Sequence, residues 1–254
     1  MFHSRWRLAL KVVPVVLGVI AVKFLCHYFG GEILSLSPLF TAVVSANIFL
    51  LGFLISGVLV DYKESEKIPG EMASSLEAMA DEGAIILKMK KSDDARAFLE
   101  HIVAFNQLIV DWFHGRERTT TVMADLTHFN DDFSVLENQT QAAFIARLKQ
   151  EQNILRKLIT RAHTIRDTEF LGTGYAIAEI ISAVLIIGLV FIKMEPFYES
   201  VFFVTFVSFM LIYMIQFIKD LDNPFGYAEG DNMVEDVPLK PLFDSKQRIE
   251  KHLE

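Results

Sequence analysis

The sequence has one cysteine and no excess of positive charge, and both absences narrow the classes of protein to which it can belong. Cys26 alone can form neither a disulfide within the chain nor a cysteine-based metal site. The 254 residues carry a formal net charge of -8, whereas a nucleic-acid-binding domain needs clustered lysine and arginine. We therefore expect no nucleic-acid partner and a Cys26 that behaves as a small apolar side chain.

Motifs that carry catalysis are also missing from the sequence. It has no phosphate-binding loop, no Gly-x-Gly-x-x-Gly and no nucleophile elbow around a serine. The histidines are scattered instead of being paired with cysteines or carboxylates at metal-ligand spacing: His101, His114, His128 and His163. We expect no catalytic residues, no metal and no cofactor, and hence a protein that is not an enzyme.

The chain is rich in apolar residues. It is 52% hydrophobic with 22 phenylalanines, and its mean hydropathy is +0.34. Four apolar runs, at about residues 8–29, 38–60, 170–192 and 198–218, can each cross about 30 Å of hydrocarbon at about 1.5 Å per residue. The sequence therefore predicts an all-α integral membrane protein with four transmembrane helices.

The positions of lysine and arginine predict how these helices are oriented. Basic residues precede the first run, whereas the loop between the first two runs has none. We expect both termini, a helical domain at about 64–167 and the tail at 220–254 to be cytoplasmic, with the helices in the plasma (inner) membrane. Lys23, near the far end of the first run, is expected to extend its amine to the outer interface.

The middle region is polar, and its apolar residues recur at steps of three and four, which is typical of amphipathic helices. The stretch at 115–138 is less regular, and we expect loops there. Pro69 is expected to break or bend the helix that continues from the second run.

Glu179 is an ionisable residue inside the third run, where a charge is costly. One interpretation is an ion pathway or a contact between helices. The other is a carboxylate near the cytoplasmic interface that is hydrogen-bonded to a neighbouring helix. The sequence does not separate the two.

One face of the second run is polar at its ends and aromatic in its middle. Thr41, Ser45, Phe49 and Phe53 are four residues apart, and Ser56 continues the face, because steps of four drift only about 40° around a helix. This pattern fits a helix-packing stripe. It also fits a pore wall in which wet vestibules flank an apolar gate, although a pore requires a symmetric ring of chains.

Several segments, in the same order, resemble the bestrophin family. The second run contains that family's Gly-Phe pair, and the fourth run is followed by a segment similar to its Asn/Asp-Pro-Phe-Gly signature: Asn223, Pro224, Phe225 and Gly226. The other similar segments are 64–72, 166–175, 236–239 and 248–250. The order and the topology agree along nearly the whole chain.

The resemblance implies a homopentameric ion channel in which five copies of the second run line a central pore. The family's neck of three apolar residues maps onto Ser45, Phe49 and Phe53. This is the same face that the spacing selects, so the resemblance favours the pore over the packing stripe. Ser45 departs from the family, which usually has an apolar residue there, and a shorter or leakier gate is expected.

Two further features follow from the resemblance alone. A lower constriction would fall near Phe144 or Ile145. The calcium clasp of animal members is an acidic run after Pro-Phe-Gly, but residues 227–231 offer few carboxylates and calcium takes about six to eight oxygen ligands. We expect the calcium site to be absent.

The choice of ion has arguments on both sides. Rings of phenylalanine present electropositive edges, which favour anions, whereas a net acidic chain concentrates cations. The prediction is a channel for chloride or other monovalent anions within a lipid bilayer. The alternatives are a monovalent-cation channel of the same architecture and a membrane-anchored helical scaffold without transport.

Overall fold

The structure, a computed structural model, describes residues 6–167, 172–225 and 237–254. The chain forms two compact units, one made of residues 1–61 and 169–222 and the other of residues 62–168 and 223–254. We call the first the membrane unit and the second the polar unit.

The membrane unit contains the apolar helices. They are α2 (Arg7–Tyr28), α3 (Pro38–Ser65), α8 (Gly172–Phe191) and α9 (Phe197–Asp222); the last residues of α3, from Tyr62, are counted with the polar unit. Within the described residues, four helical stretches contain an apolar segment of membrane length, with mean hydropathies of 2.2 to 2.4. The prediction of an all-α protein with four candidate membrane spans is confirmed.

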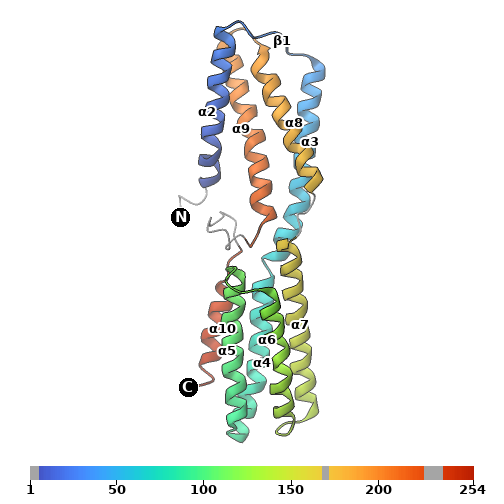
Figure 1. The fold of residues 1–254 in the computed structure, drawn as a ribbon, viewed down its shortest axis with the longest axis vertical. Helices are drawn as coiled ribbons and strands as arrows, with labels where there is room; N and C mark the ends of the chain where they lie inside the picture. Colours follow the sequence, from blue (N-terminus) through green and yellow to red (C-terminus); the bar gives the residue numbers. More distant parts are fainter. Residues whose placement is uncertain (1–5, 168–171, 226–236) are drawn as a thin grey trace. The chain divides into compact units, whose positions relative to one another are not determined.

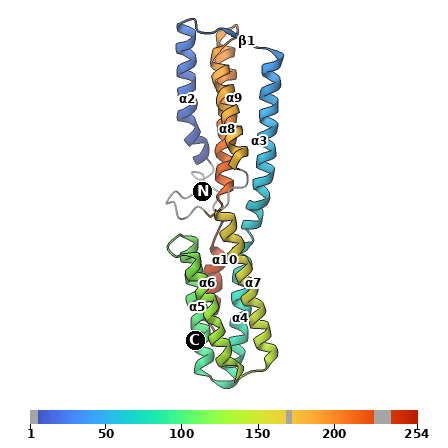
Figure 2. The ribbon, with the colours of Figure 1, turned by 45° about the vertical axis from the view of Figure 1, so that its right-hand side comes forward.

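Within the membrane unit, α2 and α3 lie on opposite sides of α8 and α9 (Figures 1 and 2). A short parallel pair joins the loops at one end: β1 (Leu34–Ser35) bonds to β2 (Ile192–Lys193). The segment after α2 is thereby tied to the segment after α8, far along the chain.

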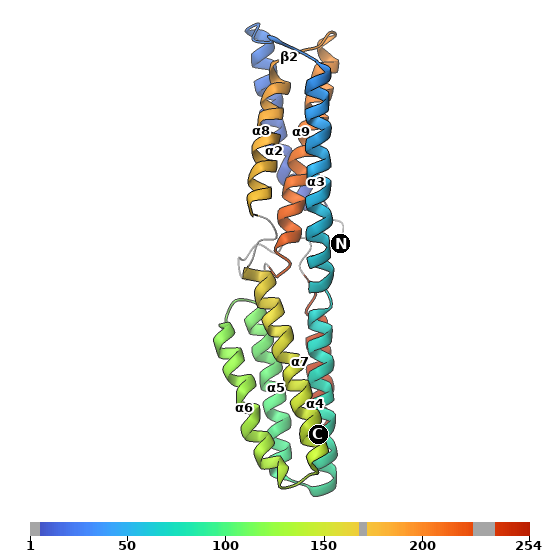
Figure 3. The same cartoon turned by 90° about the vertical axis from the view of Figure 1, so that its right-hand side faces the viewer.

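The polar unit is a bundle of amphipathic helices that run side by side (Figure 3). They are α4 (Ile68–Lys90), α5 (Asp93–Phe113), α6 (Thr119–Glu137), α7 (Ala142–Asp167) and α10 (Lys240–Glu250). Phenylalanine rings at the centre meet edge to face, with the ring centroids of Phe105 and Phe129 5.2 Å apart. Such pairs add to the stabilisation that burial of their apolar area supplies.

The loop expected at 115–138 is present only at 115–118. The expectation is wrong for the rest, because α6 occupies nearly all of it. Its buried residues follow steps of four, three, four and three, which form one continuous apolar face: Val122, Leu126, Phe129, Phe133 and Leu136. Residues of modest helix propensity hid this pattern in the sequence. They are the three threonines at the start of the helix and the Asp131-Asp132 pair.

The break expected at Pro69 is confirmed. Helix α3 ends at Ser65, and α4 begins at Ile68 with Pro69 in its first turn. A proline in the first turn costs little, because backbone N–H groups in that turn have no acceptor within the helix and the N–H that proline lacks would have been unpaired.

Candidate functional site

Helix α3 has two opposite faces within the membrane unit. Asn47, Leu51 and Leu54 are buried, whereas Phe49 and Phe53 are 79% and 62% exposed. Both phenylalanines are two residues from Leu51, and two residues turn through about 200°. The two rings therefore point away from the rest of the membrane unit, on the face that also carries the exposed Thr41, Ser45 and Ser56.

Two hydroxyl groups of this face bond to the backbone one turn earlier. Thr41 donates its hydroxyl to the carbonyl of Ser37 at 3.3 Å, and Ser45 donates to the carbonyl of Thr41 at 3.0 Å. Such bonds to a preceding turn let a hydroxyl group lie in apolar surroundings. The hydroxyls of Thr41 and Ser45 therefore do not by themselves indicate contact with water.

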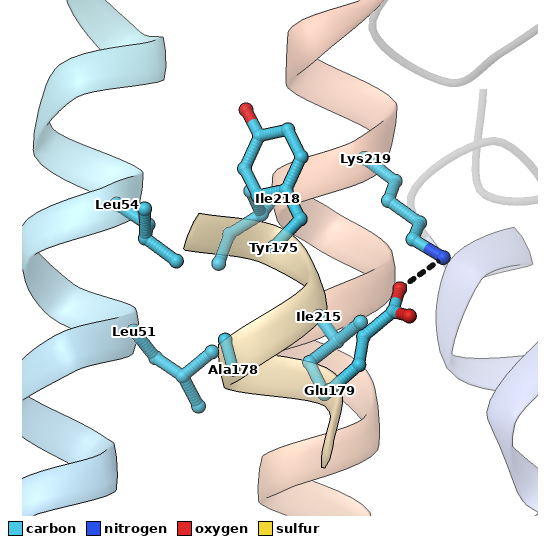
Figure 4. A pocket seen from close by; sticks show the side chains of 8 residues that line it. All are labelled: Leu51, Leu54, Tyr175, Ala178, Glu179, Ile215, Ile218 and Lys219. Atoms are coloured by element: carbon cyan, nitrogen blue, oxygen red, sulfur yellow. Dashed lines mark ion pairs between the residues drawn. The ribbon is translucent and has the colours of Figure 1, made fainter. Parts of the chain in front are cut away.

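The buried face of α3 packs along α8 through three successive contacts. Phe40 lies against Gly188, where a Cβ atom would approach the ring to 3.0 Å. One and a half to two turns further along, the side-chain amide of Asn47 donates to the hydroxyl of Ser182 at 2.8 Å. Beyond this pair, Leu51 and Leu54 point toward Ala178 across a small pocket (Figure 4).

This pocket is apolar on one side and charged on the other. The remaining lining residues come from α8 and α9: Tyr175, Glu179, Ile215, Ile218 and Lys219. Glu179 and Lys219 form an ion pair that joins α8 to α9, on the side away from Leu51 and Leu54 (Figure 4). Glu179 thus contacts a neighbouring helix, which is a feature that both interpretations of this residue share.

The expectation for Lys23 is wrong. Its side chain is completely buried, and its amine donates to the carbonyls of Val190 at 3.2 Å and Ile192 at 2.6 Å. A carboxylate oxygen of Glu32 lies 2.5 Å from the amine. The C-terminal end of α8, strand β2 and the loop after α2 surround the amine with acceptors, so it has no need to reach the interface.

Glu32 completes this cluster from the loop between α2 and α3. Its second carboxylate oxygen lies 2.9 Å from Nδ1 of His27, whose ring stacks on Phe197. Burial opposes the charge of Glu32, but its bonds to Lys23 and His27 outweigh burial, and the net effect lowers the pKa of this carboxyl group. The cluster holds α2, the loop and the end of α8 together.

The signature residues have a packing role in the polar unit. The Phe225 ring is buried with its centroid 5.1 Å from that of Phe113, and the N–H of Val237 donates to the carbonyl of Pro224 at 3.1 Å. These contacts attach the segment after α9 to the bundle. Gly226 and residues 227–231, the position of the calcium clasp in animal bestrophins, lie outside the described residues.

The two candidates for a lower constriction begin α7. Phe144 is half-buried, and Ile145 packs against the core of the polar unit. In the described part of the chain, no cluster of three or more His, Cys, Asp or Glu side chains is arranged to hold a metal ion.

Sequence reasoning missed two polar contacts. The first is the Asn47–Ser182 pair, although a polar amide within an apolar run is itself a signal. The second joins α5 to α6: Nδ1 of His101 lies 2.5 Å from Asp132, and Nε2 lies 3.5 Å from Asp125. The two aspartates are seven residues apart and share one helix face, a spacing that could have identified them.

Comparisons with known proteins agree on the fold. No family model and no curated protein matches the sequence. A variant of the bacterial bestrophin homologue from Klebsiella pneumoniae matches with a TM-score of 0.81 over 97% of this chain and 98% of that chain, at 14% identity. Another structure of a bestrophin homologue from this organism gives a TM-score of 0.76 over 98% and 97%, at 16% identity. The resemblance found in the sequence is thus confirmed for the fold over nearly the full length.

Proposed function

We propose that this chain, which has the fold of bacterial bestrophin homologues, assembles as a homopentamer and conducts small inorganic ions passively through a central pore lined by α3. One observation carries the proposal. The face of α3 that carries Phe49 and Phe53 is opposite the face that packs on α8. Five such helices around an axis would enclose a passage that a single chain cannot.

The gate of this pore is a neck formed by Ser45, Phe49 and Phe53. Rings of phenylalanine at successive turns make a narrow apolar passage, which closes when water leaves it. Ser45 returns its hydroxyl to its own helix and adds little bulk, so the closed gate consists of the two phenylalanine layers. Thr41 and Ser56 flank the neck in wider parts of the pore.

The charge distribution supports an orientation with both termini and the polar unit in the cytoplasm, in the plasma (inner) membrane. A second constriction would then lie in the polar unit. Of its two candidates we favour Phe144, because Ile145 already packs against the core.

Chloride and other monovalent anions are the proposed ions. The edges of the Phe49 and Phe53 rings carry positive partial charge, and a narrow neck free of carboxylates adds no opposing charge. The net charge of -8 favours a cation channel only if the acidic side chains face the conduction path.

A membrane-anchored scaffold is the second candidate. Ile85 and Met89 lie one turn apart on α4 and are exposed in the polar unit, where apolar side chains could contact a partner. A scaffold has no pore, so the loss of the Phe49 and Phe53 rings should not change ion flux. Substitution of these two residues therefore discriminates between the two functions.

The discriminating experiment measures chloride flux from liposomes that contain the purified protein. Replacing both rings, by Phe49→Ala with Phe53→Ala, widens and wets the neck. We expect chloride efflux to rise by about tenfold, since removal of a dewetted gate lowers the barrier by roughly 1.4 kcal/mol or more.

The matched control is Phe202→Ala with Phe206→Ala on α9. These two phenylalanines are also four residues apart and are 62% and 58% exposed, but α9 is not the proposed pore helix. The control should conduct like the wild type. Equal flux from the wild type and the neck variant, both assembled as pentamers, would favour the scaffold.

A further inference from the structure

The Asn47–Ser182 pair places a hydrogen bond between two otherwise apolar helix faces. Asn47 is 2% exposed and Ser182 is 1% exposed, and the amide donates to the hydroxyl at 2.8 Å. The amide oxygen of Asn47 is also buried, with no hydrogen-bond partner. An aliphatic side chain would be less costly at this position, so packing alone does not account for an asparagine.

The other contacts between α3 and α8 have little directional preference. Phe40 lies on Gly188 at one end, and Leu51 and Leu54 face Ala178 at the other. Apolar side chains against glycine and alanine can slide or turn at small cost, because dispersion and burial do not depend strongly on direction. A hydrogen bond does depend on direction, so the Asn47–Ser182 pair defines one rotation of α3.

Asn47 lies within one turn of Phe49, on the opposite face of the same helix. A rotation of α3 that broke the hydrogen bond would therefore move the neck rings by the same angle. The residues beside the two rings are Ala46 on one side and Gly52 on the other, and both are exposed. Rotation in either direction replaces a phenyl ring with a much smaller group.

We infer that Asn47 is a positioning residue for the neck: its hydrogen bond to Ser182 of α8 fixes the rotation of α3 at which Phe49 and Phe53 are directed away from the membrane unit. This inference rests on the proposed pore. It assigns to α8 the task of orienting the pore helix, in addition to crossing the membrane.

The test is single-channel recording of three variants. Asn47→Leu and Ser182→Ala each remove the hydrogen bond, and the exchange Asn47→Ser with Ser182→Asn offers the same two groups in reverse order. We expect both single variants to raise the unit conductance by about twofold or more, since smaller groups enter the neck. The exchange should bring the conductance back toward that of the wild type, which a merely structural role would not predict.

Thr205→Val is the matched control. The hydroxyl of Thr205 is also in a membrane helix, but it donates to the carbonyl of Val201 in its own helix at 2.7 Å, so its loss should leave the conductance unchanged. Unchanged unit conductance in both single variants, from a wild type that conducts, would overturn the inference and leave the proposed function standing. A wild type without current would instead overturn the proposed function.

A second measurement tests the rotation without any need for current. In a Cys26→Ala background, Phe53→Cys supplies the only thiol in the chain. Its rate of reaction with a membrane-impermeant thiol reagent reports its access from water. Adding Asn47→Leu should change this rate by about threefold or more, because access limits thiol reactivity, whereas adding Thr205→Val should not. Equal rates with and without Asn47→Leu would show that α3 does not turn and would overturn the inference.

Discussion

At the scale of single residues, several charged side chains of the membrane unit lie in ion pairs. The amine of Lys23 is surrounded by two carbonyls and the Glu32 carboxylate, which together match the three donors of an ammonium group. Glu179 and Lys219 pair between α8 and α9. The Lys23 bonds to the carbonyls of Val190 and Ile192 connect α2 to the end of α8 and to β2, and the Glu179–Lys219 pair connects α8 to α9. Charged side chains here therefore hold the helices together.

Removing the Lys23 amine should be strongly destabilising. Lys23→Met keeps most of the side-chain volume but leaves the buried Glu32 carboxylate without its main partner, a change that costs about 3–5 kcal/mol in comparable sites. We expect a clear fall in the melting temperature in detergent. Lys193→Met is the control, because the Lys193–Glu195 pair is exposed and exposed pairs contribute little. Equal melting temperatures for the two variants would contradict the account.

His101 predicts a pH dependence of stability in the polar unit. Burial opposes its charge, but the bond to Asp132 and the charges of Asp132 and Asp125 outweigh burial and raise the pKa of this imidazole above its usual value. Only the protonated ring can donate to both aspartates. The stabilisation is therefore fully present below the unfolded pKa of about 6.5 and is lost as the pH rises through the higher folded pKa.

The measurement is the melting temperature of the wild type and of His101→Gln between about pH 6 and pH 9. The wild type should be more stable than the variant at the acidic end, by about 1.5–3 kcal/mol for a charge-assisted bond. The difference should shrink as the pH rises. A difference that stays constant or grows with pH would contradict the assignment of the proton to His101.

At the scale of helices and loops, the apolar runs and Pro69 could be read from the sequence because their signals are local. The run expected at about 8–29 lies within one residue of α2 (Arg7–Tyr28) at each end. Helix α6 was missed because polar residues dilute its apolar face. The bond of Lys23 to the Val190 carbonyl and that of Asn47 to the Ser182 hydroxyl could not be predicted. These partners lie 167 and 135 residues away in the chain, and only the folded arrangement brings them together.

Two glycines of α4 test how closely α4 packs on α5. A Cβ atom at Gly83 would lie 2.9 Å from the buried ring of Phe98, whereas one at Gly70 would meet nothing within 4 Å. Gly83→Ala should lower the stability by about 1 kcal/mol, because overpacking outweighs the better helix propensity of alanine. Gly70→Ala should be neutral or stabilising. A melting temperature raised equally by both changes would contradict close packing at Gly83.

At the scale of the whole molecule, a single chain leaves apolar and aromatic surface uncovered on α3. In the proposed pentamer, the Phe49 and Phe53 face lines a shared pore and the rest of each membrane unit meets lipid or a neighbouring chain. The proposed function therefore needs both assembly and conduction. A scaffold needs neither a common axis nor an open passage.

The measurement that tests this account most directly is a planar-bilayer recording of the purified 28.9 kDa chain under a chloride gradient, on material whose mass in solution is that of a pentamer. The account predicts a current that reverses near the chloride equilibrium potential and grows when Phe49 and Phe53 are replaced by alanine. Silent bilayers from correctly assembled pentamers, for the wild type and the alanine variant alike, would contradict it.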